Sequence, residues 1–137
     1  MIVLVEDNDD ARELLRELLE YEKYDVRTAS DGPSGLELIR QTRPCVALID
    51  VGLPGMTGHE VARNIRRDGL TTTLIAVTGY GQKSDRDAAL SAGFDNHITK
   101  PVDFDKLLRL IERIVSSCQE SSANSKIAGG ENVESIP

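Results

Sequence analysis

The sequence predicts an α/β fold in which a parallel five-stranded sheet is doubly wound, with helices on both of its faces. Apolar runs of strand length alternate along the chain with stretches of helical periodicity, which is typical of repeated βα units. The segments between the runs are too long for hairpins and favour parallel strands. With 137 residues the chain is long enough for one domain that needs no disulfide or metal to hold its core.

The first half of the chain contains three predicted strands and two predicted helices. The strands cover residues 2–5, 24–28 and 46–50. The second alternates apolar and polar residues, as an edge strand does, whereas the third is apolar up to its final acid and indicates burial on both faces. A helix over residues 8–20 has Asn8 or Asp9 as its cap. Asp31 opens the next helix, which ends before Pro44 and turns Gly35, Leu36 and Ile39 to the core.

The second half contains two more strands and three more helices. A helix over 59–67 is closed by Asp68 and Gly69, and a strand follows over 74–77. A helix over 84–92 stops at Gly93, and a short strand surrounds residues 97–99. The last helix runs from 103 to about 116, with more apolar residues than one face requires. Either all of them are buried in the core, or some contact a partner or a second copy of the chain.

The folded domain is expected to cover residues 1–116, with residues 117–137 as a flexible tail or linker. This tail is rich in Ser, Asn, Gly and Glu, and we expect no DNA-binding or catalytic second domain within these residues. Because Met1 lies directly against the first strand, we expect the chain to be a segment of a longer protein.

Charge and composition exclude several classes of function. The net charge of −7 argues against a nucleic-acid surface, which needs clustered Lys and Arg. No apolar run approaches the roughly 18 residues of a membrane span, and no signal peptide precedes the first strand. We therefore predict a cytoplasmic location without membrane contact. Cys45 and Cys118 are predicted to be reduced thiols, with Cys45 a small buried hydrophobe.

Four of the five strands end in polar groups. Because the carboxyl ends of parallel strands meet at one edge of a sheet, three carboxylates, one hydroxyl and one ammonium are expected to converge there. These groups belong to Glu6 and Asp7 after the first strand, Asp50 at the end of the third, Thr78 with Gly79 after the fourth, and Lys100 before Pro101 after the fifth.

Three clustered carboxylates raise one another's pKa unless a cation joins them, and Mg²⁺ prefers such oxygen ligands. Considered alone, Glu6 and Asp7 also suit a helix cap or a solvated loop. Lys100 is expected to pair with Asp50 and with an incoming anion, although a single Lys is normally a surface charge. The Thr78 hydroxyl suits a phosphoryl oxygen, and strand propensity is its other explanation.

A carboxylate can attack a phosphoryl group and become an aspartyl phosphate, and Asp50 is the candidate nucleophile. Such a transfer depends on positioning and on neutralising oxygen charge, which Mg²⁺, Lys100, Thr78 and the Gly79 N–H would provide. No nucleophilic triad competes, because His59 and His97 fall on a helix start and a strand. The Walker signature is absent as well.

These residues resemble the receiver domain of two-component response regulators over positions 1 to 116. That family folds as a (βα)₅ flavodoxin-like sheet of order 2-1-3-4-5. The resemblance is carried by Val5-Glu6-Asp7-Asn8, Leu48-Ile49-Asp50, Leu53-Pro54-Gly55-Met56-Thr57-Gly58, Val77-Thr78-Gly79 and Thr99-Lys100-Pro101.

The resemblance implies that Asp50 accepts a phosphoryl group from a phosphohistidine. It also implies that Asp7, Asp50 and the backbone carbonyl of Gly52 bind Mg²⁺ directly, while Glu6 acts through a water molecule. The phosphorylated domain then changes conformation and binds different partners.

The resemblance further implies that Thr78 and Lys100 hold the phosphoryl oxygens and that their movement is transmitted to the loop after Thr78. His97 stands where the family often has a rotating Tyr or Phe, and it would report the change on the surface of the fourth helix, fifth strand and fifth helix. Gly52 and Tyr80 lie where family members adjust the lifetime of the phosphoryl group.

The implied partners are a histidine kinase or a histidine phosphotransfer protein, with a homodimer through the last helices as a further expectation. The chain is either a free-standing regulator, which catalyses only its own phosphorylation and dephosphorylation, or the receiver segment of a hybrid sensor histidine kinase.

Three other functions compete with a phosphoacceptor. A metal-dependent phosphohydrolase using Asp50 would need a second acid soon after it, and residues 51–53 supply none. A pseudo-receiver that only binds partners should have lost part of the acid, Thr and Lys set, which is complete here. A flavodoxin-like cofactor binder would have few rings to stack on a flavin, since aromatic residues are 4% of the chain.

Overall fold

A computed structural model describes the backbone of residues 1–79, 83–129 and 131–133, and the side chains of residues 1–79 and 85–118. It divides the chain into two compact units, Met1–Phe104 and Asp105–Pro137. The first unit contains the five-stranded sheet and the polar strand ends.

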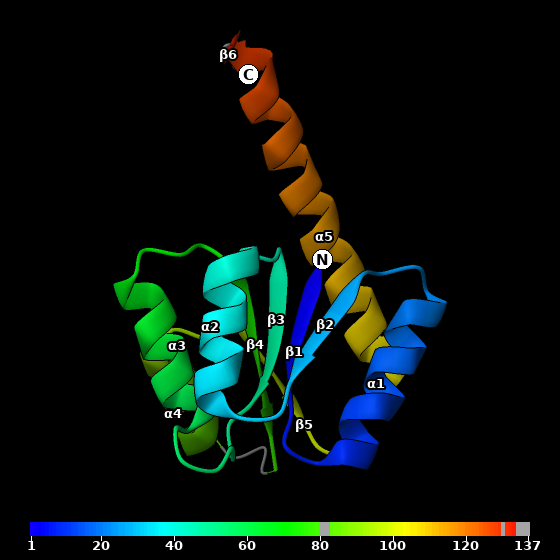
Figure 1. Ribbon diagram of the computed structural model, residues 1–137, viewed down its shortest axis with the longest axis vertical. Coiled ribbons are helices and arrows are strands. Elements are labelled where there is room, and N and C mark those ends of the chain that lie inside the picture. Colours follow the sequence, from blue (N-terminus) through cyan, green and yellow to red (C-terminus); the bar gives the residue numbers. More distant parts are fainter. Residues whose placement is uncertain (80–82, 130, 134–137) are drawn as a thin grey trace. The chain divides into compact units, whose positions relative to one another are not determined.

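The sheet has the predicted topology. All of its strand pairs are parallel and their order is β2-β1-β3-β4-β5. Its carboxyl edge points down in Figure 1. The strands are β1 (Ile2–Val5), β2 (Val26–Ala29), β3 (Val46–Asp50), β4 (Thr73–Thr78) and β5 (Asn96–Thr99).

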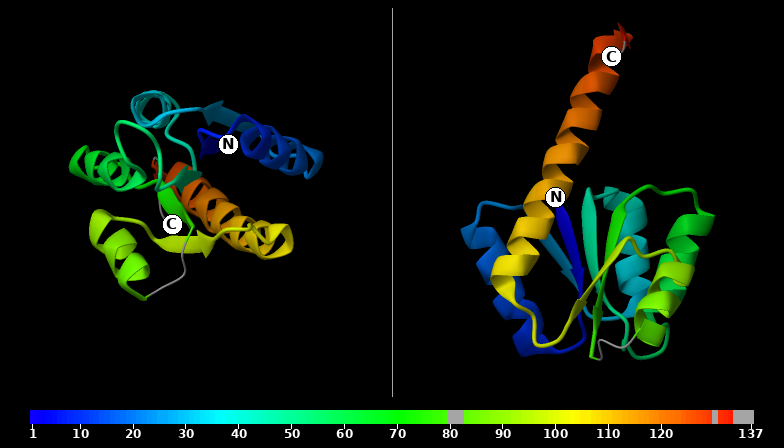
Figure 2. Two further views of the ribbon diagram at one scale, coloured as in Figure 1. Left: turned by 90° about the horizontal axis from the view of Figure 1, so that it is seen from below. Right: turned by 180° about the vertical axis from the view of Figure 1, so that it is seen from behind.

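Helices alternate with the strands, as the repeated βα pattern predicts. Within the first unit, α1 lies on one face of the sheet and α2, α3 and α4 lie on the other (Figures 1 and 2). The helices are α1 (Asp9–Tyr21), α2 (Gly32–Thr42), α3 (Gly58–Arg67), α4 (Lys83–Ala92) and α5 (Phe104–Ile127).

The largest buried apolar cluster lies between the sheet and helices α2, α3 and α4, and α1 adds two buried leucines, Leu15 and Leu19. Every residue of β1 and β3 is buried, as expected for central strands covered on both faces. The predicted inward positions Leu36 and Ile39 are buried too. Gly35 allows α2 to approach β1, because a Cβ atom there would lie 2.6 Å from a methyl carbon of Val5.

Side-chain caps fix where the first three helices begin. Asn8 accepts a hydrogen bond from the Ala11 N–H at 2.9 Å, and Asp31 accepts one from the Ser34 N–H at 2.8 Å. Thr57 opens α3 in a reciprocal capping box with the helix's first acid. Of the two candidate caps of the first helix, Asn8 is the one that caps α1, and Asp31 opens α2 as predicted.

Two element boundaries differ from the sequence prediction by more than one residue. Strand β2 begins at Val26 rather than residue 24, because β1 begins at Ile2 and Ile2 pairs with Val26. Helix α5 continues to Ile127 rather than ending near residue 116. No Pro or Gly occurs between residues 117 and 127, so nothing in this polar stretch breaks the helix. A pair of short parallel strands, β6 (Ala128–Gly129) and β7 (Glu131–Val133), follows.

The prediction of reduced thiols is wrong. Neither cysteine is free, and both Cys45 and Cys118 are disulfide-bonded. Cys45 is half-buried rather than buried. The sequence supplies only the number and spacing of the cysteines, whereas a disulfide requires two Cβ atoms about 4 Å apart, which only the folded chain determines.

The apolar residues of α5 fall into two groups. Leu107 and Ile111 are fully buried. Four others are half-buried: Leu108, Leu110, Ile114 and Val115. Full burial of the whole set is therefore wrong, and contact of the half-buried residues with a partner or a second copy stays a prediction. In the part of the chain that the structure describes, no helix combines the length and apolar character needed to cross a membrane.

Arg66, near the end of α3, joins the segments at the amino edge of β4. Its guanidinium donates to the carbonyl oxygens of Gly93 at 3.0 Å, Leu70 at 3.0 Å and Thr72 at 2.8 Å. It also donates to Oδ2 of Asp95 at 2.8 Å. These bonds tie the loop before β4 to the loop before β5, at the edge of the sheet opposite the polar strand ends.

We predict that Arg66→Met lowers the free energy of unfolding by about 2 kcal/mol or more, because several carbonyl groups lose a charged donor. Urea denaturation followed by circular dichroism measures the change. The matched control is Arg67→Met, which removes a neighbouring guanidinium that donates to Asn64 Oδ1 at 3.2 Å. That control should change stability by less than about 0.5 kcal/mol. Equal losses in the two variants would contradict the assignment.

His59, in the first turn of α3, is held in an apolar contact. Its ring meets that of Phe94 edge to face, with the centroids 6.1 Å apart. Its Nε2 is buried without a hydrogen-bond partner among the described residues. Burial lowers the pKa of His59, the charge of Arg63 lowers it further, and Asp85 partly opposes them. The neutral imidazole is therefore the form that suits the fold.

We predict that His59 makes stability fall as the pH falls. In the unfolded chain, His59 takes up a proton as the pH falls below its ordinary pKa of 6.5. In the native protein, His59 takes up that proton only at a lower pH. The contribution of neutral His59 to the free energy of unfolding is therefore complete above pH 6.5, and it is lost as the pH falls toward the lower pKa of the native protein. Urea titrations between about pH 8 and pH 5 should show a shallower loss for His59→Gln than for the wild type. His97→Gln serves as the control, and an unchanged slope in His59→Gln would refute the prediction.

Candidate functional site

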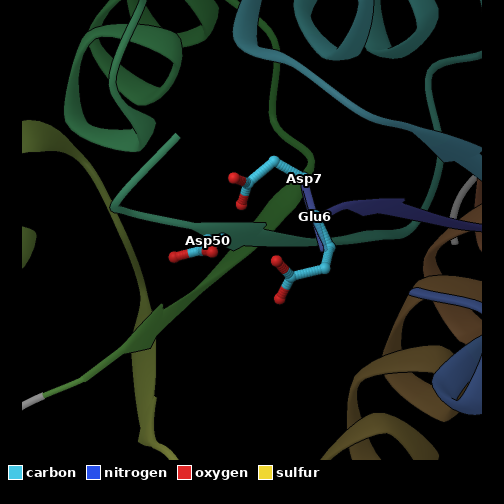
Figure 3. A group of neighbouring side chains, drawn as sticks. All are labelled: Glu6, Asp7 and Asp50. Atoms are coloured by element: carbon cyan, nitrogen blue, oxygen red, sulfur yellow. The ribbon is translucent and has the colours of Figure 1, made fainter. Parts of the chain in front are cut away.

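Three carboxylates gather at the carboxyl edge of the sheet. One oxygen from each of Glu6, Asp7 and Asp50 lies within 4.8 Å of the others. Figure 3 shows Asp50 at the end of β3 and the other two acids directly after β1. Glu6 and Asp50 are buried, whereas Asp7 is exposed. The predicted convergence of these acids is therefore present, with one side open to solvent.

Strand register brings the acids together. Val5 of β1 pairs with Ile49 of β3, so the next residue along each strand is an acid. The Glu6 N–H still donates to the Ala29 carbonyl of β2 at 3.1 Å, which extends the ladder past the end of β1. The site is consequently built on the rigid end of a sheet and not on a free loop.

Lys100 supplies the opposing charge. Its Nζ lies 3.1 Å from Oδ2 of Asp50 and 3.6 Å from Oε1 of Glu6. Its backbone N–H donates to the Thr78 carbonyl at 2.7 Å, which ties it to the end of β4. Burial alone would lower the pKa of Lys100, but the hydrogen bond and charge of Asp50, together with Glu6, raise it. Lys100 is therefore held as a cation.

Glu6 lies in a less favourable environment for charge. Burial raises its pKa, and the negative charge of Asp50 raises it further. A hydrogen bond from the Asn8 N–H to Oε2, at 3.1 Å, and the charge of Lys100 oppose that rise. The site thus carries an excess of negative charge that a further cation would relieve.

Both carboxylate oxygens of Asp50 have partners. Oδ1 accepts a hydrogen bond from the Gly52 N–H at 2.9 Å, and Oδ2 faces Lys100. Gly58 lets the first turn of α3 approach the same strand end, because a Cβ atom there would lie 2.6 Å from the Asp50 carbonyl oxygen. A larger residue at position 58 would displace the helix or the strand end.

Thr78 is the last residue of β4 and is buried beside the site. Its neighbour Val77 pairs with Asp50, which places the end of β4 next to the end of β3. The following Gly79 has open space where a side chain would be, so its backbone can be approached. Both predicted phosphoryl-binding groups thus stand at the expected edge.

The remaining predicted residues are only partly placed. His97 lies in β5 opposite Ala76 and is half-buried. Gly52 is exposed in the loop after β3. Tyr80 lies outside the described residues.

Two contacts that shape the acidic turn could not be predicted from the sequence. The Asn8 N–H donates to Glu6, as described above, and Nη1 of Arg12 donates to the Glu6 carbonyl oxygen at 2.9 Å. Each contact involves a backbone atom, which residue type does not reveal. The position of Arg12, in the first turns of the helix after the acids, is the one available signal.

The donor set fits Mg²⁺ rather than a softer metal. All three candidate side chains offer carboxylate oxygens, and no His or Cys belongs to the cluster among the residues the structure describes. Hard oxygen ligands and an open, exposed side suit an ion that retains several waters.

Comparison with known proteins identifies a family and several proteins to which this chain is similar. The family model described as "Response regulator receiver domain" matches residues 2–112. An uncharacterized 14.6 kDa protein of Leptolyngbya boryana is 39% identical over 114 residues, covering 82% of this chain and 87% of that protein. The response regulator MprA of Mycobacterium leprae is 32% identical and covers 93% of this chain, but the match spans 56% of MprA.

A solved structure shows the same likeness. The CheY-like response regulator receiver domain protein of Methanospirillum hungatei JF-1 has a TM-score of 0.77 and is 31% identical, with 87% of this chain and 96% of that chain covered. The fold order and the family thus agree with the resemblance seen in the sequence.

We predict that Lys100→Met raises the pKa of Glu6 above its value in the wild-type protein, because the charge of Lys100 lowers it. A ¹³C NMR titration of the Glu carboxyl groups in metal-free protein measures this change. Lys23→Met, in the turn after α1, is the control and should leave the Glu6 midpoint unchanged. An unshifted Glu6 midpoint in Lys100→Met would contradict the ion-pair network.

Proposed function

This chain belongs to the response regulator receiver domain family of two-component signalling, and we propose that Asp50 is its phosphoacceptor. The observation that carries the proposal is the environment of Asp50. Its buried carboxylate lies against Lys100 and beside two further acids at the open edge of the sheet. A nucleophile, a cation and a set of metal ligands therefore share one small region.

In the proposed reaction, a carboxylate oxygen of Asp50 attacks the phosphorus atom of a phosphohistidine. The new P–O bond forms as the P–N bond breaks, and the histidine nitrogen leaves with its electron pair and takes up a proton. Hydrolysis of the acyl phosphate later restores the carboxylate. The domain thus catalyses its own phosphorylation and dephosphorylation.

Asp7, Asp50 and the carbonyl oxygen of Gly52 would hold Mg²⁺ directly, with Glu6 acting through a water molecule. The ion would neutralise the charge of the phosphoryl oxygens. Two observations support this assignment. The carboxylate oxygens lie within 4.8 Å of one another, and Gly52 is exposed and bonded through its N–H to Oδ1 of Asp50.

Thr78 and Lys100 would bind the phosphoryl oxygens after transfer. Lys100 already contacts Oδ2 of Asp50, so a short movement carries its charge to the new group. Thr78 shares a backbone bond with Lys100, which couples the two residues. We propose that half-buried His97 reports this movement on the surface of α4 and β5. Gly52 and Tyr80 are proposed to adjust the phosphoryl lifetime.

The proposed partner is a histidine kinase or a histidine phosphotransfer protein. The chain spans only about half the length of the MprA relatives that it matches, 46% to 56%. The parent protein and its output are therefore only proposed, and one proposed parent is a hybrid sensor histidine kinase. Several expectations stay predictions. They are a domain limit at residue 116 with a flexible tail after it, and a homodimer formed through the last helices. They also include a cytoplasmic location and the lack of contact with nucleic acid or membranes.

Intact mass spectrometry after incubation with Mg²⁺ and acetyl phosphate tests the proposed function. We expect one phosphate adduct that requires Mg²⁺, is cleaved by hydroxylamine and is absent from Asp50→Asn. Asp31→Asn is the matched control, since Asp31 caps α2, and it should still form the adduct.

A wild-type protein that forms no adduct and does not bind beryllofluoride would overturn the phosphoacceptor assignment. That result would favour a pseudo-receiver that acts only by binding partners.

A further inference from the structure

Arg12 of α1 bridges the acidic turn and the first turn of the helix. Its Nη1 donates to the Glu6 carbonyl oxygen at 2.9 Å, and its Nη2 donates to Oδ1 of Asp9 at 2.6 Å. Only 16% of the Arg12 side chain is exposed. The two arms of one planar guanidinium thus hold two points on the chain at a fixed separation.

The Glu6 carbonyl is well placed to control the next residue. It belongs to the same planar peptide unit as the N–H of Asp7, so fixing its direction also fixes the direction in which Asp7 leaves β1. On the other side of Glu6, its own N–H is bonded to the Ala29 carbonyl. The Glu6 backbone is thereby held from both sides, and the Arg12 bond is the one that acts toward Asp7.

The charge of Arg12 cannot explain a favourable effect on a cation. A positive charge beside the acids repels Mg²⁺, and here it is largely matched by Asp9 at 2.6 Å. Removing that charge would therefore strengthen Mg²⁺ binding if electrostatics dominated. Loss of the hydrogen bond to Glu6 would weaken it, so the two roles predict changes of opposite sign.

We propose that Arg12 is a positioning residue of the metal site, which aligns Glu6 and Asp7 through its two-armed bridge. This inference rests on the proposed function, because it presupposes that the acidic cluster binds Mg²⁺. Arg12 touches neither the phosphoryl group nor the ion, and it acts through the backbone between the two acids.

The test compares Arg12→Met with Arg16→Met by isothermal titration calorimetry with Mg²⁺. Arg16 lies one turn further along α1, and its guanidinium contacts only side chains of the same helix, those of Glu13 and Glu20, among the described residues. Both variants lose one positive charge. We expect Arg12→Met to weaken Mg²⁺ binding about tenfold, as the loss of a group that orients a metal ligand does. Arg16→Met should bind as the wild type does.

A second readout does not depend on the ion. In metal-free protein, amide hydrogen exchange at Asp7 and Asn8 should be faster in Arg12→Met than in Arg16→Met, while the melting temperatures show both variants to be folded. If Arg12→Met does not fold, Arg12→Lys decides the question. It retains the charge but not the planar fork, and it should bind Mg²⁺ several times more weakly than the wild type.

Unchanged or stronger Mg²⁺ binding in Arg12→Met, or an equal loss in Arg16→Met, would overturn the positioning role. Wild-type affinity in Arg12→Lys would do the same. These results differ from failure of the proposed function, in which the wild-type protein itself binds no Mg²⁺.

Discussion

The two ion contacts of Lys100 are the constraint on which the carboxyl edge of the sheet depends. Asp50 and Glu6 are buried and close together, and their like charges would oppose the folded arrangement without a nearby cation. Lys100 can serve them only because its backbone is bonded to Thr78, which fixes β5 beside β4. The pairing of the strands thus determines the electrostatics of the site, and the site in turn favours that pairing.

Most of the fold could be predicted because local signals agreed with the final packing. The apolar run of β3 is buried throughout, and Asp31 caps α2 where Gly, Pro and Ser follow it. The exceptions arise where the outcome depends on distant parts of the chain. The limits of β2 follow its register with β1, and the bonding of Cys45 and Cys118 depends on which side chains folding brings together. The composition of residues 117–127 indicated a linker, yet nothing in it prevents a helix.

The residues of the candidate site also fall into two groups, those that the sequence predicts and those that only the folded structure reveals. Glu6, Asp7, Asp50 and Lys100 were predictable because each lies at the end of a strand or within two residues of it, and parallel strands bring such residues to one edge. The role of Arg12 was not, because its partner is a carbonyl oxygen that every residue type possesses. Residue type reveals which groups can react, but the bonds that orient those groups are made largely by the backbone.

The contacts of Asp50 also limit how large the proposed switch can be. In the unphosphorylated protein one oxygen accepts a bond from the Gly52 N–H and the other faces Lys100. Shifting a conformational equilibrium from about 1:99 to 99:1 requires roughly 5.5 kcal/mol of differential binding. One hydrogen bond to a charged group contributes about 1.5 to 3 kcal/mol. A switch of that size would therefore need at least two such bonds that form only in the phosphorylated state. Because the Lys100 contact already exists and would be transferred to the phosphoryl group, the proposed switch would draw most of the difference from the Thr78 hydroxyl and the proposed metal ligands.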